Sequence, residues 1–220
     1  MNDSRTVDYY RDRAAEYEQI YYRHQPERRR EIDDEADRLK SFAADRDVLE
    51  LACGTGYWSR VMAQTARRIT AVDIWMEMLD EARKKKYPAP VDFVRGDMER
   101  LPIREQAFDF VAVGFWFSHQ PRQFYDRFFE LLKRPLLPGG KIWMIDNNPP
   151  AEGRFKESVC VDEHGNNFKK RFLDDGRKYV ILKNYFEKED LISIFEPFFR
   201  IEKLVHGRYY WSILLDLSEK

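Results

Sequence analysis

Two glycines one residue apart follow a short apolar run in the first quarter of the sequence. Residues 48–51 form the run, Gly54 and Gly56 come next, and an amphipathic segment begins near Tyr57. This order is typical of a buried parallel strand, a tight turn and the start of a helix. Glycine adopts positive φ readily and lets the backbone approach a ligand without a Cβ in between. The stretch therefore predicts a site where main-chain atoms touch a ligand.

A second strand that ends in an acid supports that prediction. Residues 68–73 are largely apolar and end in Asp73, about 20 residues beyond the glycines, where nucleotide-binding α/β folds place the acid that receives ribose hydroxyls. The dinucleotide pattern G-x-G-x-x-G lacks its third glycine, because Ser59 stands in that position. The pattern therefore favours a nucleotide ligand without a pyrophosphate.

The other predicted strands also end in residues suited to ligand binding. Asp97 follows the third strand, residues 114–119 follow the fourth, and Asp146 ends the fifth. Ligands of open α/β sheets bind at the carboxyl ends of the strands, so these residues should meet Glu50 and Asp73 at one edge. For each acid, the alternative is a strand-end or capping carboxylate that faces solvent.

Several of these motifs together resemble those of a known enzyme family. They are Glu50-x-x-x-Gly54-x-Gly56, Asp73, Gly96-Asp97-Met98 and Leu136-Leu137-Pro138-Gly139-Gly140. In this order, from about Tyr9 to Asp146, the sequence resembles the class I S-adenosylmethionine-dependent methyltransferases, and among them the small-molecule type 11 and type 25 enzymes. The resemblance implies S-adenosyl-L-methionine as the cofactor and S-adenosyl-L-homocysteine as its product.

The resemblance also implies a role for individual residues. Asp73 is expected to form bidentate bonds to the ribose hydroxyls. Asp97 or the Met98 amide is expected to meet the adenine amine, with Ile74 and Met98 as apolar clamps. Glu50, or a water that it holds, is expected near the methionine amino group. The full expected cofactor-binding set is Tyr10, Tyr17, Glu50, Ala52, Gly54, Gly56, Asp73, Ile74, Met78, Asp97, Met98, Gly114 and Phe115.

His119 is the candidate catalytic residue. Methyl transfer from an activated sulfonium needs placement of the nucleophile and removal of its proton. His119 follows the fourth predicted strand and is expected to face the pocket, and an unperturbed pKa near 6.5 permits the role of base. The alternative is that His119 caps the next helix or forms hydrogen bonds within its own loop.

A metal site is not expected. Asp146-Asn147 resembles the metal-holding pair of the catechol-type branch of the family. That branch also needs an acid just after the fourth strand, where this chain has Gly114, Phe115 and Trp116. Without a third hard oxygen ligand in view, the reaction is predicted to be metal-independent.

The pattern of elements predicts a doubly wound α/β fold. Five apolar strands, at 48–51, 68–73, 91–95, 108–113 and 142–145, alternate with amphipathic helices, which favours a parallel sheet covered on both faces. Pro121 is expected to open the helix after the fourth strand, and residues 138–140 are expected to form a turn before the fifth. Residues 200–206 and 209–217 are expected to add an antiparallel pair. The prediction is a mostly parallel, seven-stranded, Rossmann-like sheet with an antiparallel C-terminal hairpin.

The 220 residues are expected to form one methyltransferase domain with four parts. Residues 1–44 form an N-terminal helical cover, with helices at 5–22 and 27–42, and residues 45–146 form the cofactor-binding core. Residues 147–186 form an insertion with a β-hairpin around Asp174-Asp175-Gly176, and residues 187–220 carry the last helix and strand pair. The tyrosines of the cover are expected either to close over the cofactor or simply to pack against the core.

The net charge and the cysteine content of the chain limit the kinds of partner that are expected. A net charge of -1 gives no bulk attraction to nucleic acid or to an anionic membrane, and the basic clusters at 28–30 and 84–86 are typical of solvated helix faces. The two cysteines, Cys53 and Cys160, favour a reducing compartment. No apolar run approaches the ~20 residues of a membrane span, and the polar N-terminus has no signal-peptide core. A cytoplasmic protein without nucleic-acid or membrane partners is expected.

The predicted function is therefore metal-independent transfer of a methyl group to oxygen or nitrogen of a small-molecule acceptor. Aromatic residues expected near the pocket, among them Tyr21, Tyr57, Trp116 and Tyr185, favour an apolar or planar acceptor. Basic residues of the insertion could hold an acidic group of the substrate; they are Arg154, Lys156, Arg171 and Lys183. The alternatives are an RNA- or protein-modifying methyltransferase and a cofactor-binding protein without turnover.

Overall fold

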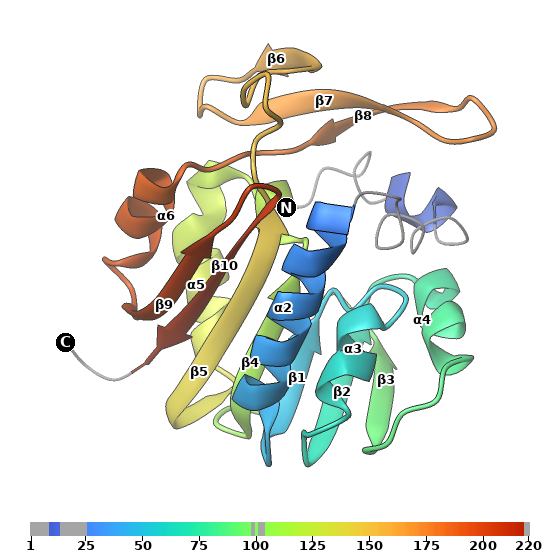
Figure 1. The fold of residues 1–220 in the computed structure, drawn as a ribbon, viewed down its shortest axis with the longest axis vertical. Coiled ribbons are helices and arrows are strands. Elements are labelled where there is room, and N and C mark those ends of the chain that lie inside the picture. The colour runs from blue at the N-terminus through green and yellow to red at the C-terminus, as the bar shows by residue number, and fades with distance from the viewer. Residues whose placement is uncertain (1–8, 14–25, 98–99, 101–103, 218–220) are drawn as a thin grey trace.

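A seven-stranded sheet forms the centre of the molecule (Figure 1). The computed structural model describes residues 9–13, 26–97, 100 and 104–217. The strand order is β3-β2-β1-β4-β5-β10-β9, and only β10 and β9 run antiparallel to their neighbours. The predicted doubly wound, mostly parallel sheet is confirmed. The strands are β1 (Asp47–Leu51), β2 (Arg68–Asp73), β3 (Val91–Arg95), β4 (Phe108–Gly114), β5 (Leu136–Asn147), β9 (Arg200–His206) and β10 (Tyr210–Asp216).

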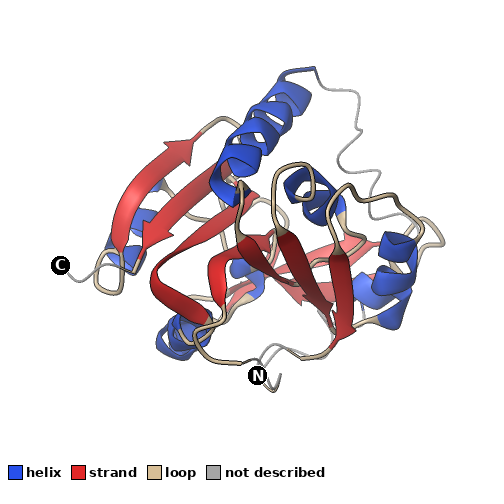
Figure 2. Ribbon diagram, turned by 90° about the horizontal axis from the view of Figure 1, so that it is seen from below, coloured by secondary structure: helices blue, strands red, loops and turns tan. Residues whose placement is uncertain are grey.

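Helices cover both faces of this sheet, as Figure 2 shows. Successive side chains of a strand point to opposite faces, so each strand feeds two cores. Val48 packs in one core with Leu39 of α2 and Trp58 of α3, whereas Leu49 packs in the other with Phe129 of α5. The helices are α2 (Pro26–Ala43), α3 (Tyr57–Met62), α4 (Met76–Arg83), α5 (Tyr125–Lys133) and α6 (Lys188–Phe195). No helix in the described ranges has the length and apolar character needed to cross a membrane.

A second, three-stranded sheet lies across the end of the main sheet at which β5 ends (Figure 1). It contains β6 (Ser158–Val161), β7 (Asn167–Phe172) and β8 (Lys178–Leu182), all antiparallel. The hairpin expected around Asp174-Asp175-Gly176 is the β7–β8 connection. Strand β6 was not predicted, because its apolar run at 159–161 is only three residues long and shows no alternation of apolar and polar residues.

Two predicted boundaries were wrong for local reasons. Residues 138–140 lie inside β5 rather than in a turn before it, because a bulge against β4 absorbs the extra residues between Leu136 and Lys141. The helix expected from Pro121 begins at Tyr125, since Pro121 is extended at ψ 137° and a short 3₁₀ turn, η3 (Arg122–Phe124), intervenes. Most of the helix expected at 5–22 lies outside the described residues, within which residues 9–12 are helical.

Candidate active site

A cavity opens at the carboxyl ends of β1, β2 and β4, where the sequence predicted a site. It encloses about 60 Å³ and is therefore narrow. Its lining residues are Tyr10, Ala52, Gly54, Val72, Asp73, Ile74, Trp75, Met78, Gly96, Asp97, Gly114, Phe115 and Trp116.

The Asp73 carboxylate is a hydrogen-bond acceptor in the wall of this cavity. Its Oδ2 accepts a hydrogen bond of 2.8 Å from the Gly54 amide, and its Oδ1 accepts one of 3.0 Å from the Trp75 amide. Burial raises the pKa of Asp73, and these backbone donors oppose that shift. A carboxylate oxygen can accept more than one hydrogen bond, so the fixed carboxylate retains acceptor capacity for a pair of hydroxyls in the cavity.

The backbone around the cavity is held in unusual conformations. Ala52 and Phe115, which directly follow β1 and β4, have positive φ of 53° and 57°, and Gly54 has φ 55°. Such conformations cost about 1–3 kcal/mol each in non-glycine residues and gather at ligand sites. These conformations change the direction of the chain just after two neighbouring strands, and Ala52, Gly54 and Phe115 all line the cavity.

Glu50 lies beneath the cavity rather than in its lining. The Ser59 hydroxyl donates a hydrogen bond to the buried Glu50 carboxyl, so the residue that replaces the third glycine of the pattern is the partner of this acid. Burial raises the pKa of Glu50 to about 8. A contact between Glu50 and a bound ligand would therefore need a water between them or a movement of its side chain.

Gly56 does not line the cavity either, and its lack of a side chain allows close packing of two helices. A Cβ at this position would lie 2.6 Å from the Tyr87 hydroxyl and 3.0 Å from the Cβ of Ala82, and φ is +76°. The glycine therefore lets the start of α3 approach the end of α4. Gly114 has the same property but does line the cavity: its Cβ would lie 2.5 Å from the indole of Trp58.

The cavity brings together most of the expected cofactor residues. Of the expected set, Glu50 and Gly56 do not line it, and Tyr17 and Met98 lie outside the described residues. The expected residues in the lining are Tyr10, Ala52, Gly54, Asp73, Ile74, Met78, Asp97, Gly114 and Phe115. The expected set omitted Val72, Trp75, Gly96 and Trp116, although Gly96 belongs to the quoted motif and Trp116 was expected near the pocket.

His119 is buried and both of its ring nitrogens have partners. Nε2 lies 2.7 Å from the Tyr10 hydroxyl, and Nδ1 lies 2.5 Å from the carbonyl oxygen of Leu182 in β8. A carbonyl only accepts, so Nδ1 carries the hydrogen and Nε2 accepts the Tyr10 proton. Burial, with the charge of Lys183 nearby, lowers the pKa of His119 to about 3. The imidazole of His119 is therefore neutral and accepts a hydrogen bond from the Tyr10 hydroxyl. Of these two residues, Tyr10 lines the cavity.

Asp146, at the end of β5, is engaged by protein groups. Lys183 of the insertion donates to it at 2.7 Å and to the Ser118 hydroxyl at 2.6 Å, and the Ser118 amide donates to its other oxygen at 3.0 Å. Burial alone would raise the pKa of Asp146, but the charge of Lys183 and the hydrogen bonds from Lys183 and Ser118 together outweigh it, and the pKa is lowered. Lys183, expected to be available to a substrate acid, is thus bonded to the core.

A second cavity of about 830 Å³ adjoins the first, and Tyr10 and Phe115 line both. The N-terminal segment, the strand ends of the main sheet and the insertion all contribute to its walls, for example through Arg13, Asn147 and Arg171. Its volume lies in the range of small-molecule sites, roughly 300–1,000 Å³.

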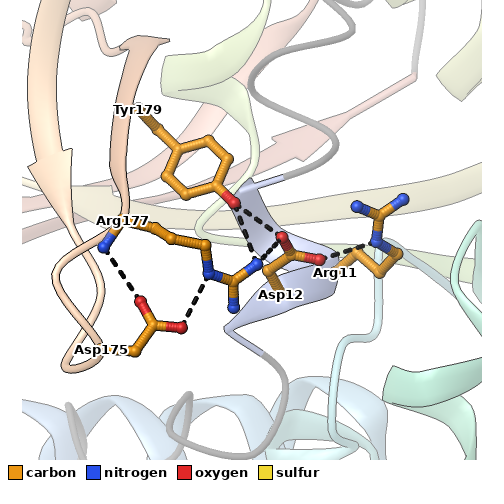
Figure 3. A network of polar contacts seen from close by, with 5 residues as sticks. All are labelled: Arg11, Asp12, Asp175, Arg177 and Tyr179. Atoms are coloured by element: carbon orange, nitrogen blue, oxygen red, sulfur yellow. Dashed lines mark hydrogen bonds and ion pairs between the residues drawn. The ribbon is translucent and has the colours of Figure 1, made fainter.

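The tip of the β7–β8 hairpin holds the segment that carries Tyr10 (Figure 3). Asp12 forms an ion pair with Arg177 and accepts a hydrogen bond of 2.6 Å from the Tyr179 hydroxyl. Asp175 holds Arg177 from its other side at 2.7 Å. Hydrogen bonds from Arg11 and Tyr179 lower the pKa of Asp12. The insertion is therefore tied to the chain at the mouth of both cavities.

Comparisons with known proteins agree with this geometry. Residues 48–140 match the family model described as a methyltransferase domain. Demethylmenaquinone methyltransferase of Listeria welshimeri is 30% identical over 119 residues, which are 51% of this chain and 50% of that protein. The corresponding protein of Oceanobacillus iheyensis is 31% identical over 115 residues, 49% of this chain and 47% of that protein. The chain thus matches about half the length of these curated relatives.

Solved structures match over nearly the whole chain. A complex of DhpI with SAH has a TM-score of 0.77 and 25% identity, covering 96% of this chain and 95% of that chain. A complex of DhpI with SAM and HEP has a TM-score of 0.76 and 26% identity, with 96% of each chain covered. The sequence match over residues 48–140 and the fold match over nearly the whole chain identify an S-adenosylmethionine-dependent methyltransferase domain with the class I fold.

Proposed function

We propose that this chain transfers a methyl group from S-adenosyl-L-methionine to oxygen or nitrogen of a small-molecule acceptor, without a metal ion. The observation that carries the proposal is the pair of adjoining cavities that share Tyr10 and Phe115. One has the acceptor groups and apolar walls that a nucleoside needs. The other is large enough for an acceptor molecule next to it.

The residues of the first cavity fit the proposed cofactor. The fixed carboxylate of Asp73 suits the two ribose hydroxyls, since each of its oxygens already has one backbone donor and can accept another. Ile74, Trp75 and Met78 supply apolar surface for the adenine, and Asp97 supplies an acceptor for its amine. When bound, the cofactor supplies a methyl group activated by its positive sulfur.

The chain itself would orient the acceptor and exclude water. Tyr10 and Phe115 stand at the junction of the cavities, and we propose that methyl transfer takes place beside them. We further propose that His119 positions Tyr10, because its Nε2 accepts the Tyr10 hydroxyl proton and its Nδ1 is held by Leu182. Direct action of His119 as the base would require its Nε2 to leave Tyr10.

A small acceptor is favoured by the walls of the second cavity. Separate parts of the chain enclose it, among them the segment at Tyr9, α2 at Arg28 and the insertion at Tyr185. The names of the curated relatives specify demethylmenaquinone, which is a small molecule. The family match at 48–140 does not include the insertion, so the acceptor of this chain need not be theirs.

The proposal can be tested with purified protein and S-adenosyl-L-methionine. A cell extract is separated by size into a small-molecule fraction and a macromolecular fraction, and each is added as the acceptor source. We expect S-adenosyl-L-homocysteine to form with the small-molecule fraction, together with a product heavier by one CH₂. Turnover only with the macromolecular fraction would instead support an RNA- or protein-modifying enzyme. Cofactor binding without turnover in either fraction would support a binding protein.

A further inference from the structure

We propose that the methyl acceptor is a small organic anion, held in the second cavity by the arginine and lysine side chains of its walls. The inference rests on the proposed function, because it names the acceptor class for the same site. The charge of the side chains that line the second cavity differs from the net charge of the chain as a whole.

The walls of the second cavity are strongly cationic. Among the described residues, the charged side chains that line it are Arg13, Arg28, Lys170, Arg171, Lys183 and a single acid, Glu157. The whole chain, in contrast, has a net charge of -1. Positive groups have therefore been gathered on these walls from the N-terminal segment, from α2 and from the insertion.

Protein carboxylates compensate only part of this charge. Glu157 pairs with Arg171 at 3.0 Å, and Asp146 pairs with Lys183. Arg13 and Arg28 donate instead to tyrosine hydroxyls, at 2.8 Å to Tyr9 and 2.5 Å to Tyr210 respectively. Within the described residues neither arginine has an acidic partner, so both offer further N–H donors to an anion.

A buried lysine beside the cavity adds to the positive field. Lys169 is 1% exposed, and its Nζ lies 4.4 Å from the centre of the Tyr185 ring, a wall of the cavity. Lys183 lies over the same ring at 5.8 Å. Burial, with the charge of Arg171 nearby, lowers the pKa of Lys169 to about 8. Partly buried cations are costly without an opposite charge, so an anion in this cavity would offset that cost.

An anionic acceptor would also explain why His119, the imidazole behind Tyr10, can be a weak base. A lone pair on a carboxylate or phosphate-type oxygen could form the new bond to the methyl carbon while the carbon–sulfur bond breaks and its electron pair stays on sulfur. The negative and positive charges then cancel, and no proton is released. Such a reaction needs no base, and the pKa of His119, lowered to about 3 by burial, leaves the imidazole a poor one.

Anion binding can be measured without the cofactor. The probes are inorganic phosphate, benzoate and phenyl phosphate, with benzamide as the neutral counterpart of benzoate, and affinities come from calorimetric titration. The test variant is Arg28→Gln/Arg171→Gln, and the control Lys86→Gln/Lys203→Gln removes the same charge at exposed positions. We expect at least one anion to bind more tightly than benzamide and to lose about tenfold or more in affinity in the test variant only.

A charge-preserving variant, Arg28→Lys/Arg171→Lys, should keep part of the affinity, which separates loss of charge from loss of folding. The proposal is overturned if no anion binds wild-type protein more tightly than benzamide, or if the glutamine variant keeps wild-type affinity. Titration with S-adenosyl-L-homocysteine distinguishes the two proposals. Its binding to wild type without any anion preference leaves only the acceptor class wrong, whereas its failure to bind overturns the proposed function itself.

Discussion

The hydroxyl of Tyr10 lies 2.7 Å from Nε2 of His119, although 109 residues separate them in the chain. The opposite nitrogen of His119 meets the carbonyl of Leu182, so one imidazole joins the N-terminal segment, the loop after β4 and the insertion. Tyr10 lines both cavities. The hydrogen bond between Tyr10 and His119 therefore holds the N-terminal segment at the place where the two cavities meet, between the proposed cofactor and acceptor.

The first prediction concerns stability and pH. The pKa of His119 is about 3 in the folded chain and near 6.5 when unfolded, so the unfolded state binds the extra proton as the pH falls. The free energy of unfolding should fall by roughly 2 kcal/mol from this group between pH 7 and pH 5. Denaturant titrations of wild type and His119→Gln at both pH values test this. An equally steep pH dependence in the variant would contradict it, and exposed His164→Gln controls for loss of a histidine.

The second prediction separates positioning from proton removal. If His119 only orients Tyr10, His119→Ala should lower kcat by about tenfold, and Tyr10→Phe should have a similar effect. The wild-type rate should also show no step near pH 6.5, because the imidazole stays neutral there. A loss of roughly 10²–10⁴ in kcat, with such a step, would instead restore His119 as the general base.

Much of the fold could be predicted because most main-sheet strands contain short apolar runs, and β2 and β4 end in an acid and a glycine respectively. Strand β6 could not, since its four residues lie mostly in solvent and no periodicity marks them. The bulge in β5 was also hidden, because Pro138, Gly139 and Gly140 have the same composition in a turn and in a distorted strand.

The site could be predicted where a residue acts through its place at a strand end. Asp73 is such a residue, and it lies in the cavity as the spacing indicated. The environments of Glu50 and His119 could not be predicted, because they depend on which groups the fold brings against them. The Ser59 hydroxyl, nine residues along the chain, donates to Glu50, whereas the Leu182 carbonyl that accepts from His119 is 63 residues away. Local sequence patterns carry no signal of such long-range packing.

The third prediction concerns the ion pair that joins the insertion to the core. Lys183 and Asp146 are both buried and lie 2.7 Å apart. Lys183→Met alone should lower the free energy of unfolding by about 3–5 kcal/mol, because it leaves a buried carboxylate without its cation. Lys183→Met/Asp146→Leu should recover much of that loss. Thermal and denaturant unfolding would measure the cycle, and a double variant as unstable as the sum of the singles would disprove the coupling.

The fourth prediction concerns the contact between the hairpin tip and the N-terminal segment. Arg177→Ala removes the ion pair to Asp12, so the segment that carries Tyr10 should open more often. Hydrogen exchange should increase at residues 9–13, and KM for the acceptor and Kd for the cofactor should both rise, because Tyr10 lines both cavities. Exposed Arg127→Ala on α5 is the matched control. Unchanged exchange and KM would mean that the tip is not part of the cover.

Affinity for the cofactor product is the measurement that tests the account most directly. Calorimetric titration with S-adenosyl-L-homocysteine would compare wild type, Asp73→Asn and Asp92→Asn, an exposed acid on β3. Loss of charge-assisted hydrogen bonds worth roughly 1.5–3 kcal/mol should weaken binding to Asp73→Asn by about tenfold to a hundredfold. Asp92→Asn should bind as wild type does. Equal affinity in all three proteins, with Asp73→Asn folded, would contradict the assignment of this cavity to the cofactor.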